Sequence, residues 1–383
     1  MLIQLYLHFP FCKRKCFYCD FCSAAAGEET VAAYCSALEN EIHQMGRRYP
    51  GARVSTVFLG GGTPTLVPPA LMGRVLDTLH SAFVLLPDAE FTSEGNPGTL
   101  TPEWLDAVRK RGLNRLSLGV QAVQDDLLRG IGRIHTAAEA RSAVKVARAH
   151  GVGNLNLDVM SGLPGQTCDM YLQTLQTVAS WGLEHISAYG LILEEGTRLW
   201  NDVQDGRVCL PPEEETARMY EQGIDCLRAL GYERYEISNF AKPGYACRHN
   251  LGYWQGEWYL GLGVAAHGML PPTEEERGAG AVRVRCAHGT DVAAYIRGED
   301  EPQRELIGAR EAMFETMMLE LRTTAGVSGE RFARLHGQSL QNAYGRQLDE
   351  LAAGGLGRWT REGFALTPRG LEVQNEALLR LMP

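Results

Sequence analysis

The feature of this chain that most limits its fold is an alternation of strand and helix patterns along its first half. Six β-patterned runs end in glycine or polar residues and are followed by helical periodicity. The runs are 2–9, 55–62, 89–97, 113–121, 153–165 and 183–193. Between two of them, Thr101 and Pro102 open a segment that ends in basic residues and Gly112, which are helix start and stop signals. This alternation predicts a parallel sheet with helical crossovers.

The number of strand–helix units refines this prediction. Six units rather than eight predict an α/β fold of the incomplete (β/α)6, TIM-like type. In full barrels of this kind the functional site lies at the C-terminal ends of the strands. Those ends are where this chain has its unusual residues, namely clustered cysteines, a glycine triplet, Glu94, Gln121 and Asp158.

Beyond residue 195 the pattern changes. A helix is expected over 212–232, followed by a stretch rich in glycine and aromatics at 247–268 and by a polar loop at 271–281. From about residue 305, two helices, two short strands and a final helix suggest a winged-helix-like unit. We therefore predict a first domain over 1–300, whose extension is about 196–300, and a second domain over 301–383.

Composition narrows the possible partners and location. The chain has 383 residues and is 45% hydrophobic, enough for one large core and a small second one. Its 37 Lys and Arg against 46 Asp and Glu give a net charge of −9, and without a basic run a nucleic-acid partner is not expected. The sequence has neither a signal-peptide pattern nor an apolar stretch of membrane-spanning length, so we expect a cytoplasmic protein.

Four cysteines lie close together in "CKRKCFYCDFCS", directly after the first predicted strand. The spacing C-x3-C-x2-C of Cys12, Cys16 and Cys19 can hold three irons of a [4Fe–4S] cluster and leave the fourth iron open. This arrangement resembles the signature of the radical S-adenosylmethionine (SAM) superfamily, in which the open iron chelates SAM. The alternative is a structural zinc site made by all four cysteines, although zinc knuckles favour two pairs separated by a longer loop. Cys22 is interpreted as a bystander.

The other strand ends carry candidate ligands of the same site. The triplet at 60–62 lets a ligand approach the backbone closely, and it resembles the radical SAM segment that binds the amino group of SAM. Buried polar residues need partners, so the polar strand-end residues should face the cleft or each other. A hydrogen-bonding network that closes the open barrel is the structural alternative. Tyr18 either lies on the adenine of SAM or packs the loop.

A broader set of segments identifies the family. The chain resembles the oxygen-independent coproporphyrinogen III oxidase family over residues 1–270, through "YLHFPFC", "CFYCDF", "FLGGGTPTLV", "EGNPGTL", "RLSLGVQ", "LDVMSGLPGQT", "AYGLILEEGT", "YEISNFA" and "HNLGYW". The resemblance implies a [4Fe–4S] cluster bound by the three cysteines and a SAM site. It places at that site Tyr6, Tyr18, Gly61, Gly62, Thr63, Glu94, Gln121, Arg133, Asp158 and Ile192.

Two features bear on the branch of the family, and both favour its heme chaperones. The oxidases carry a further cysteine two residues after the third ligand, where this chain has Phe21. "RHNLGYW" matches the H-N-x-x-Y-W element that the chaperone branch associates with heme. The resulting heme candidates are His249, Asn250, Tyr253 and Trp254. A histidine can ligate heme iron and aromatic rings can cover a porphyrin, although these four residues can equally fill a buried loop.

Other residues and functions remain open at this point. His8 and His267 are expected to be core histidines, and Cys247 is a ligand only if it is exposed with a lowered pKa. The competing functions are radical decarboxylation of coproporphyrinogen III, radical SAM methyl transfer or cyclopropanation, and a purely structural cluster. The expected partners are heme or a porphyrin, an acceptor hemoprotein and a reductant protein. A homodimer and membrane association through the acceptor are left open.

Overall fold

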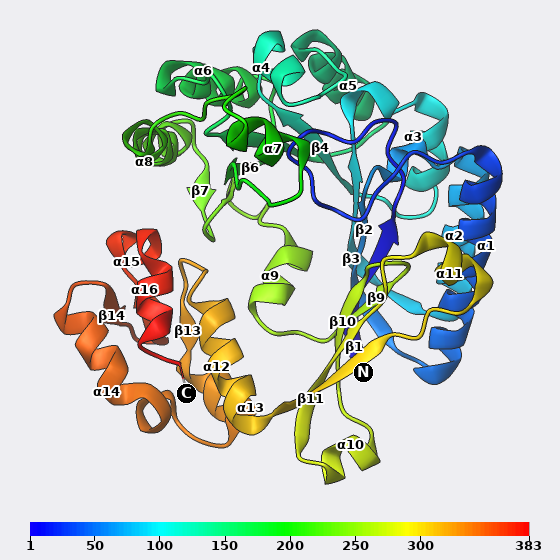
Figure 1. Cartoon of the computed structure of the whole chain (residues 1–383). Coiled ribbons are helices and arrows are strands. Elements are labelled where there is room, and N and C mark those ends of the chain that lie inside the picture. Colours follow the sequence, from blue (N-terminus) through cyan, green and yellow to red (C-terminus); the bar gives the residue numbers. More distant parts are fainter. Residues whose placement is uncertain (383) are drawn as a thin grey trace.

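The computed structural model describes residues 1–382, and its main body is a twelve-stranded sheet. Six neighbouring strands of this sheet run parallel and form its curved wall (Figure 1). They are β1 (Leu2–Phe9), β2 (Arg53–Gly61), β3 (Val84–Gly95), β4 (Arg115–Gln121), β5 (Asn154–Ser161) and β6 (His185–Gly190). The six predicted parallel strands are confirmed, and the sheet ends in β7 and β12 without closing on itself.

The connections between these strands are helical, and their α-helices lie on the outer face of the sheet (Figure 1). They are α1 (Glu28–Arg48), η1 (Pro64–Leu66), α2 (Pro69–Ala82), η2 (Pro97–Thr99), α3 (Pro102–Arg109), α4 (Asp125–Gly130), α5 (Ala137–Ala149) and α6 (Cys168–Ala179). Thr101 caps α3 as predicted, because its hydroxyl accepts the backbone N–H of Trp104 at 3.2 Å. Trp104 and Leu38 bury the inner faces of their helices in the main core.

After β6 the chain forms a short antiparallel edge and then returns to the barrel. The elements are α7 (Arg198–Gln204), α8 (Glu213–Ala229), β7 (Glu233–Arg234), β8 (Asn239–Ala241) and α9 (Arg248–Trp254). β8 pairs antiparallel with β6. α9 lies against β2, where Thr56 and His249 form a side-chain hydrogen bond of 2.7 Å. The segment "RHNLGYW" is therefore a helix, and its residues His249, Asn250 and Tyr253 line a cavity inside the barrel.

The other edge of the sheet lies mostly within the predicted extension at about 196–300, but its strands were not predicted from the sequence. It contains β9 (Tyr259–Leu262), β10 (His267–Leu270), α10 (Glu274–Gly278), β11 (Ala281–Ala287), α11 (Val292–Arg297) and β12 (Gln303–Gly308). β9 pairs parallel with β1, and the next three strands follow antiparallel. The segment 271–281, expected to be a loop, includes α10, because Thr273 and Glu276 form a capping box.

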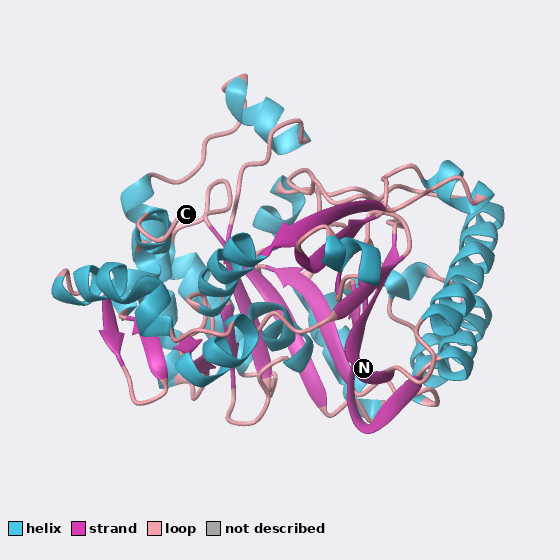
Figure 2. Ribbon diagram, turned by 90° about the horizontal axis from the view of Figure 1, so that it is seen from below, coloured by secondary structure: helices cyan, strands magenta, loops and turns pink. Residues whose placement is uncertain are grey.

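The C-terminal unit packs around a small core of its own. It contains α12 (Ala309–Glu320), β13 (Val327–Ser328), α13 (Gly329–His336), α14 (Leu340–Ala353), β14 (Gly357–Trp359), β15 (Gly363–Leu366), α15 (Pro368–Glu372) and α16 (Gln374–Leu379). Phe332, Leu348 and Phe364 are central to that core. Figures 1 and 2 show this unit on the opposite side of the molecule from α1. The division at residue 300 stays a prediction.

Within residues 1–382, no helix combines the length and the apolar character that crossing a bilayer requires.

Candidate functional site

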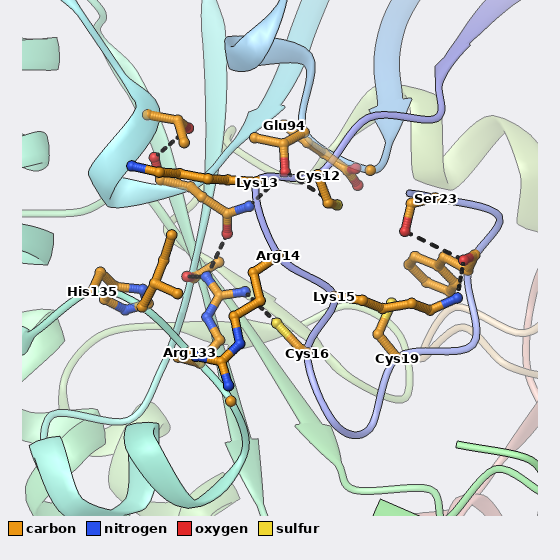
Figure 3. Close-up of a pocket in the computed structure, with 18 of the residues that line it drawn as sticks. Cys12, Lys13, Arg14, Lys15, Cys16, Cys19, Ser23, Glu94, Arg133 and His135 are labelled. Carbon is orange, nitrogen blue, oxygen red and sulfur yellow. Dashed lines mark hydrogen bonds between the residues drawn. The ribbon is translucent and has the colours of Figure 1, made fainter. Parts of the chain in front are cut away.

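The cysteine loop between β1 and α1 covers a cavity of about 160 Å³ at the C-terminal ends of the strands (Figure 3). Backbone hydrogen bonds hold the loop in place at its ends and at its middle. Cys12 N–H donates to the carbonyl of Ala24 at 3.0 Å, and Phe17 N–H donates to that of Ile131, also at 3.0 Å. The side chain of Arg198 also lies over the ring of Phe17, at 3.8 Å. A loop without regular secondary structure is thus fixed above the strand ends.

Three of the four loop cysteines face this cavity. Cys12, Cys16 and Cys19 line it as free, half-buried thiols. The Sγ of Cys12 lies 3.6 Å from the hydroxyl of Thr63, and that of Cys16 accepts from the Arg133 guanidinium at 3.5 Å. Cys22 does not line this cavity, and its thiol donates to the carbonyl of Thr290 at 3.5 Å.

This arrangement fits a three-thiolate cluster. Three thiols on one loop border one cavity, and the fourth borders a different one. Among residues 1–382, no three His, Cys, Asp or Glu side chains gather closely enough to bind a single metal ion. The loop therefore lacks the convergence of four thiols that a structural zinc site needs. A cluster, whose irons are spread over a larger group, suits the separated thiols better.

The glycine triplet after β2 brings backbone close to the cysteine loop. Gly62 donates its N–H to the carbonyl of Phe9 at 2.8 Å, and a Cβ on Gly62 would lie 2.6 Å from the carbonyl oxygen of Phe11. Gly61 has φ +105°, and a Cβ there would lie 2.7 Å from the ring of His8. The sequence suggested that these glycines make room for a ligand. The structure shows that they also make room for the protein's own loop.

Glu94 at the end of β3 and Asp158 in β5 give the cavity its acidic side. The carboxylate of Glu94 accepts the N–H of Gly61 at 3.2 Å. Burial, with a contribution from the charge of Asp158, raises the pKa of Glu94 to about 8. Burial also raises the pKa of Asp158, whose carboxylate accepts from Asn156 at 2.7 Å and from Ser117 at 3.3 Å. The acidic side therefore carries less negative charge at pH 7 than two free carboxylates would.

Arg133 and Gln121 complete the cavity. The guanidinium of Arg133 donates to the side chain of Asn96 and to the carbonyl of Gly119, besides Cys16. Gln121 ends β4 with φ 70°, a left-handed conformation that is rare for a residue with a side chain. Sequence reasoning missed Asn96, which also donates to Thr63 at 2.7 Å. Its signal was its place two residues after Glu94 in "SEGNP".

The cavity gathers most of the residues that the family resemblance assigned to SAM, but not all of them. Those that line it are Tyr18, Gly61, Gly62, Thr63, Glu94, Gln121, Arg133 and Asp158. Tyr18 also packs against the apolar cluster that contains Leu128 and Ile131. Tyr6 does not line this cavity but borders two neighbouring cavities, of about 470 and 260 Å³. Ile192 is 70% exposed and lines none of these three cavities. The roles of these residues stay predictions.

Three of the heme candidates on α9, His249, Asn250 and Tyr253, line one cavity of about 260 Å³ beside the first, and Trp254 does not line it. His249 is fully enclosed, with Nδ1 bonded to Thr56 at 2.7 Å and Nε2 to the Tyr253 hydroxyl at 2.9 Å. Burial, assisted by Arg115, lowers the pKa of His249 to about 3. Asn250 donates to the hydroxyl of Tyr235 at 3.4 Å.

The two aromatic residues of α9 lie in different surroundings. Trp254 packs under Arg322, whose guanidinium lies 5.1 Å from the centre of the indole. Tyr253 borders the larger cavity described below. Of the four heme candidates, Tyr253 alone lines that cavity. The arrangement of His249 and Asn250 matches the structural alternative, in which they bond a buried segment.

Three further residues were singled out from the sequence. His8 is buried, with Nδ1 bonded to the Tyr6 hydroxyl at 3.1 Å and Nε2 to the carbonyl of Cys22 at 3.0 Å. His267, in contrast, is exposed, so its expected place in the core is wrong. Cys247 is buried, its thiol donates to Glu90 at 3.3 Å, and burial raises its pKa to about 12. Cys247 therefore lacks both properties that a thiolate ligand needs.

A second cavity, of about 470 Å³, adjoins the first. It lies between β1, the extension strands β9 to β11 and α12 of the C-terminal unit, which contributes Leu319. Phe21, Gly61 and Glu94 border both cavities and so belong to a common wall.

Comparison with known proteins agrees with this geometry. Residues 6–178 match the family model of the Radical SAM superfamily, and residues 307–373 match that of the HemN C-terminal domain. In a solved structure, coproporphyrinogen III oxidase (HemN) from Escherichia coli, a radical SAM enzyme, the fold matches with a TM-score of 0.82. The match covers 99% of this chain and 90% of that one, at 21% identity. The expected radical SAM fold is thereby confirmed.

Curated relatives match over nearly the whole chain. The heme chaperone HemW of Bacillus subtilis (strain 168) is 38% identical, over 97% of both chains. The heme chaperone HemW of Escherichia coli (strain K12) is 34% identical, over 98% of this chain and 97% of its own. A mitochondrial radical S-adenosyl methionine domain-containing protein 1 of Mus musculus is 33% identical, over 99% of this chain and 87% of its own.

Proposed function

The chain belongs to the HemW heme chaperone family of radical SAM proteins, and we propose that it binds a SAM-coordinating [4Fe–4S] cluster and heme, and delivers the heme to acceptor hemoproteins. The observation that carries this proposal is the full-length relation to heme chaperones, at 38% identity with the Bacillus subtilis protein. The same chain is 21% identical to the oxidase whose fold it has. A shared fold does not fix the activity, because activity depends on the residues of the site.

In this proposal Cys12, Cys16 and Cys19 hold the cluster. When bound, the cluster supplies an open iron for SAM and the electron that cleaves it. The protein's own groups then orient SAM and exclude water. The guanidinium of Arg133 donates to the Cys16 sulfur at 3.5 Å and so holds that side chain at the edge of the cavity. Glu94 and Asp158 line the same cavity and would be the acidic partners for the positively charged groups of SAM.

Phe21 distinguishes this chain from an oxidase. Its ring stands where the oxidase pattern has a cysteine, and it borders both cavities with 61% of its surface exposed. A phenyl ring supplies neither a thiolate nor a proton to a porphyrinogen in that place. It can instead cover the face of a flat apolar ligand.

The test uses the full chain with its cluster reconstituted under anaerobic conditions. Heme is added until one equivalent is bound to the protein. The transfer of this heme to an apo-hemoprotein is then followed through the heme absorption band of the acceptor. In parallel, the protein is incubated with reductant, SAM and coproporphyrinogen III, and porphyrin products are separated by chromatography. We expect heme transfer and no decarboxylated product.

The control variant is Cys16→Ser, which tests whether transfer needs the cluster. Many turnovers of decarboxylated porphyrin by the unchanged protein would make it an oxidase. Failure of the unchanged protein to bind heme would refute the chaperone proposal.

A further inference from the structure

The second cavity has the size and lining of a site for a flat, largely apolar ligand. Its volume of about 470 Å³ lies within the range of small-molecule sites, about 300–1,000 Å³. Tyr6, Tyr253 and Tyr259 provide aromatic faces, and Met269 and Leu319 provide aliphatic surface. The family relation that led to the proposed function calls for a heme site, and this inference rests on that function.

Three histidines lie near this region, and they differ in whether a ring nitrogen is available. Both nitrogens of His8 and both nitrogens of His249 are bonded inside the protein. His267, at the start of β10, is exposed, lines the cavity, and has no hydrogen bond or ion pair to its ring within residues 1–382. An axial ligand of heme iron needs a free imidazole nitrogen. His267 therefore meets this requirement where the sequence candidate His249 does not.

Met269 lies two residues further along β10 and lines the same cavity. Residues two apart on a strand point to the same face, so the imidazole and the thioether enter the cavity together. Both are side chains that ligate heme iron in proteins. The strand thus presents a second possible ligand beside His267.

A buried cation on the neighbouring strand supplies the complementary chemistry for the polar edge of heme. Arg283 of β11 is 5% exposed and lines the cavity. Its guanidinium forms no ion pair within residues 1–382, and its one side-chain hydrogen bond goes to Thr316 at 3.5 Å. The nearby acids are engaged elsewhere, since Glu315 pairs with Arg285 and Glu320 pairs with Arg331.

A buried guanidinium with so few partners is unfavourable unless a ligand pairs with it. Burial lowers the pKa of Arg283, in accordance with this lack of compensation. A carboxylate matches a guanidinium in geometry and charge. Heme carries two propionate carboxylates, so it offers the partner that Arg283 lacks.

The backbone near this cavity is also unusual. Among residues 1–382, the two non-glycine residues with positive φ are Gln121 at 70° and Ala265 at 56°. Gln121 lines the first cavity and Ala265 the second. Such conformations are strained for residues with a side chain and cluster at functional sites. The second cavity therefore shares this feature with the first.

We infer that this second cavity is the heme site, with His267 as an axial ligand of the iron and Arg283 as the partner of a propionate. α9 contributes Tyr253 to the wall of the cavity, and His249 holds that helix against β2. Heme then lies next to the SAM cavity, separated from it by Phe21, Gly61 and Glu94.

The first experiment titrates the full chain with ferric heme and records the Soret band. His267→Ala is compared with His249→Ala, and thermal melting identifies any variant that has not folded. Loss of His267 should weaken heme binding by about tenfold or more and shift the Soret band. His249→Ala should keep the band position of the unchanged protein. The opposite result, a shifted band in His249→Ala and an unchanged one in His267→Ala, would overturn the inference.

The second experiment tests the propionate contact with two ligands, heme and heme dimethyl ester, in which the carboxylates are neutral. Arg283→Met should weaken heme binding by about tenfold and leave binding of the ester nearly unchanged, because a charge-assisted pair is lost only for heme. Arg283→Lys keeps the charge and should recover part of the heme affinity. Equal losses for both ligands, or no loss for either, would refute the role of Arg283.

The two proposals fail in different ways. If the unchanged protein binds no heme, the proposed function is wrong. If it binds heme with full affinity in both His267→Ala and Arg283→Met, the function stands and the location of the heme is wrong.

Discussion

The two cavities are built by the chain in different ways. The first is lined by the cysteine loop and by the ends of consecutive parallel strands, with no lining residue beyond Asp158. The second joins Tyr6 of β1 to strands β9 to β11 and to Leu319 of the C-terminal unit. Short local patterns thus describe the first cavity, whereas only the folded chain assembles the second.

The two cavities also differ in chemistry. Acidic, basic and thiol groups border the first, as a polar cofactor with charges of both signs requires. The second is mainly aromatic and aliphatic and has one buried guanidinium. A site for SAM and a site for heme would be expected to differ in this way.

The largest expected effect separates the two cavities through their cysteines. Cys16→Ser should reduce cluster iron to background, because the two thiolates that remain, Cys12 and Cys19, are too few to hold the cluster. Cys22→Ser is the matched control and should keep its iron, since Cys22 borders only the second cavity. The iron content and the cluster absorption band are measured for both variants. Equal losses of iron in the two variants would break the division between the cavities.

The next effect uses two adjacent glycines. Gly62→Ala would place a Cβ 2.6 Å from the Phe11 carbonyl and should weaken SAM binding by about tenfold. Gly61→Ala adds a clash with His8, at 2.7 Å, on the wall common to both cavities, so it should weaken SAM and heme binding alike. Calorimetric titrations with each ligand distinguish the two. Normal heme binding in Gly61→Ala would show that the common wall does not matter for heme.

A pH dependence should distinguish the polar cavity. The pKa of Glu94, about 8, means that its carboxyl is protonated at pH 7. Facing a positively charged ligand, it should release this proton on binding, so SAM affinity should rise with pH, by at most about tenfold per unit, and level off above about pH 8. Glu94→Gln should remove the slope. A SAM affinity that is flat between pH 6 and 8 in the unchanged protein would contradict this assignment.

The smallest effect concerns Phe21. Because its ring is 61% exposed, Phe21→Ala should weaken heme binding by less than about fivefold and leave the iron content unchanged. Phe21→Cys restores the residue of the oxidase pattern and should still give no decarboxylated porphyrin. Decarboxylated porphyrin formed by Phe21→Cys would show that this single position determines whether the protein acts as a chaperone or as an oxidase.

The sequence predicts the fold of the first half of the molecule well, because the strand and helix patterns and the cysteine spacing there are local. β1 was predicted with its observed bounds, and the cysteine spacing and strand-end residues identified the lining of the first cavity. The secondary structure beyond residue 255 is predicted less well. β11 and β12 pair antiparallel at one end of the sheet, and β12 is largely exposed, so its residues show no clear alternation of apolar and polar positions.

The histidines show what the sequence could not provide. His249 sits in a recognisable motif, but the folded chain uses both of its nitrogens for internal bonds. His267 follows an apolar run and was expected in the core, yet the turn at Gly263 and Ala265 leaves its ring exposed at the start of β10. Whether a ring nitrogen is free depends on tertiary contacts, which a motif does not contain. The same holds for Arg283, whose lack of a partner is visible only after folding.

The wall that the two cavities have in common has a consequence for regulation. Glu94 and Gly61 border both spaces, so with SAM in one and heme in the other, as proposed, each ligand would change the charge or position of groups that the other touches. Binding free energies are reciprocal, so whatever factor SAM imposes on heme affinity, heme imposes on SAM affinity. The cellular concentration of SAM would then determine the affinity with which this protein retains heme. The release of heme to an acceptor would in turn change the occupancy of the SAM site.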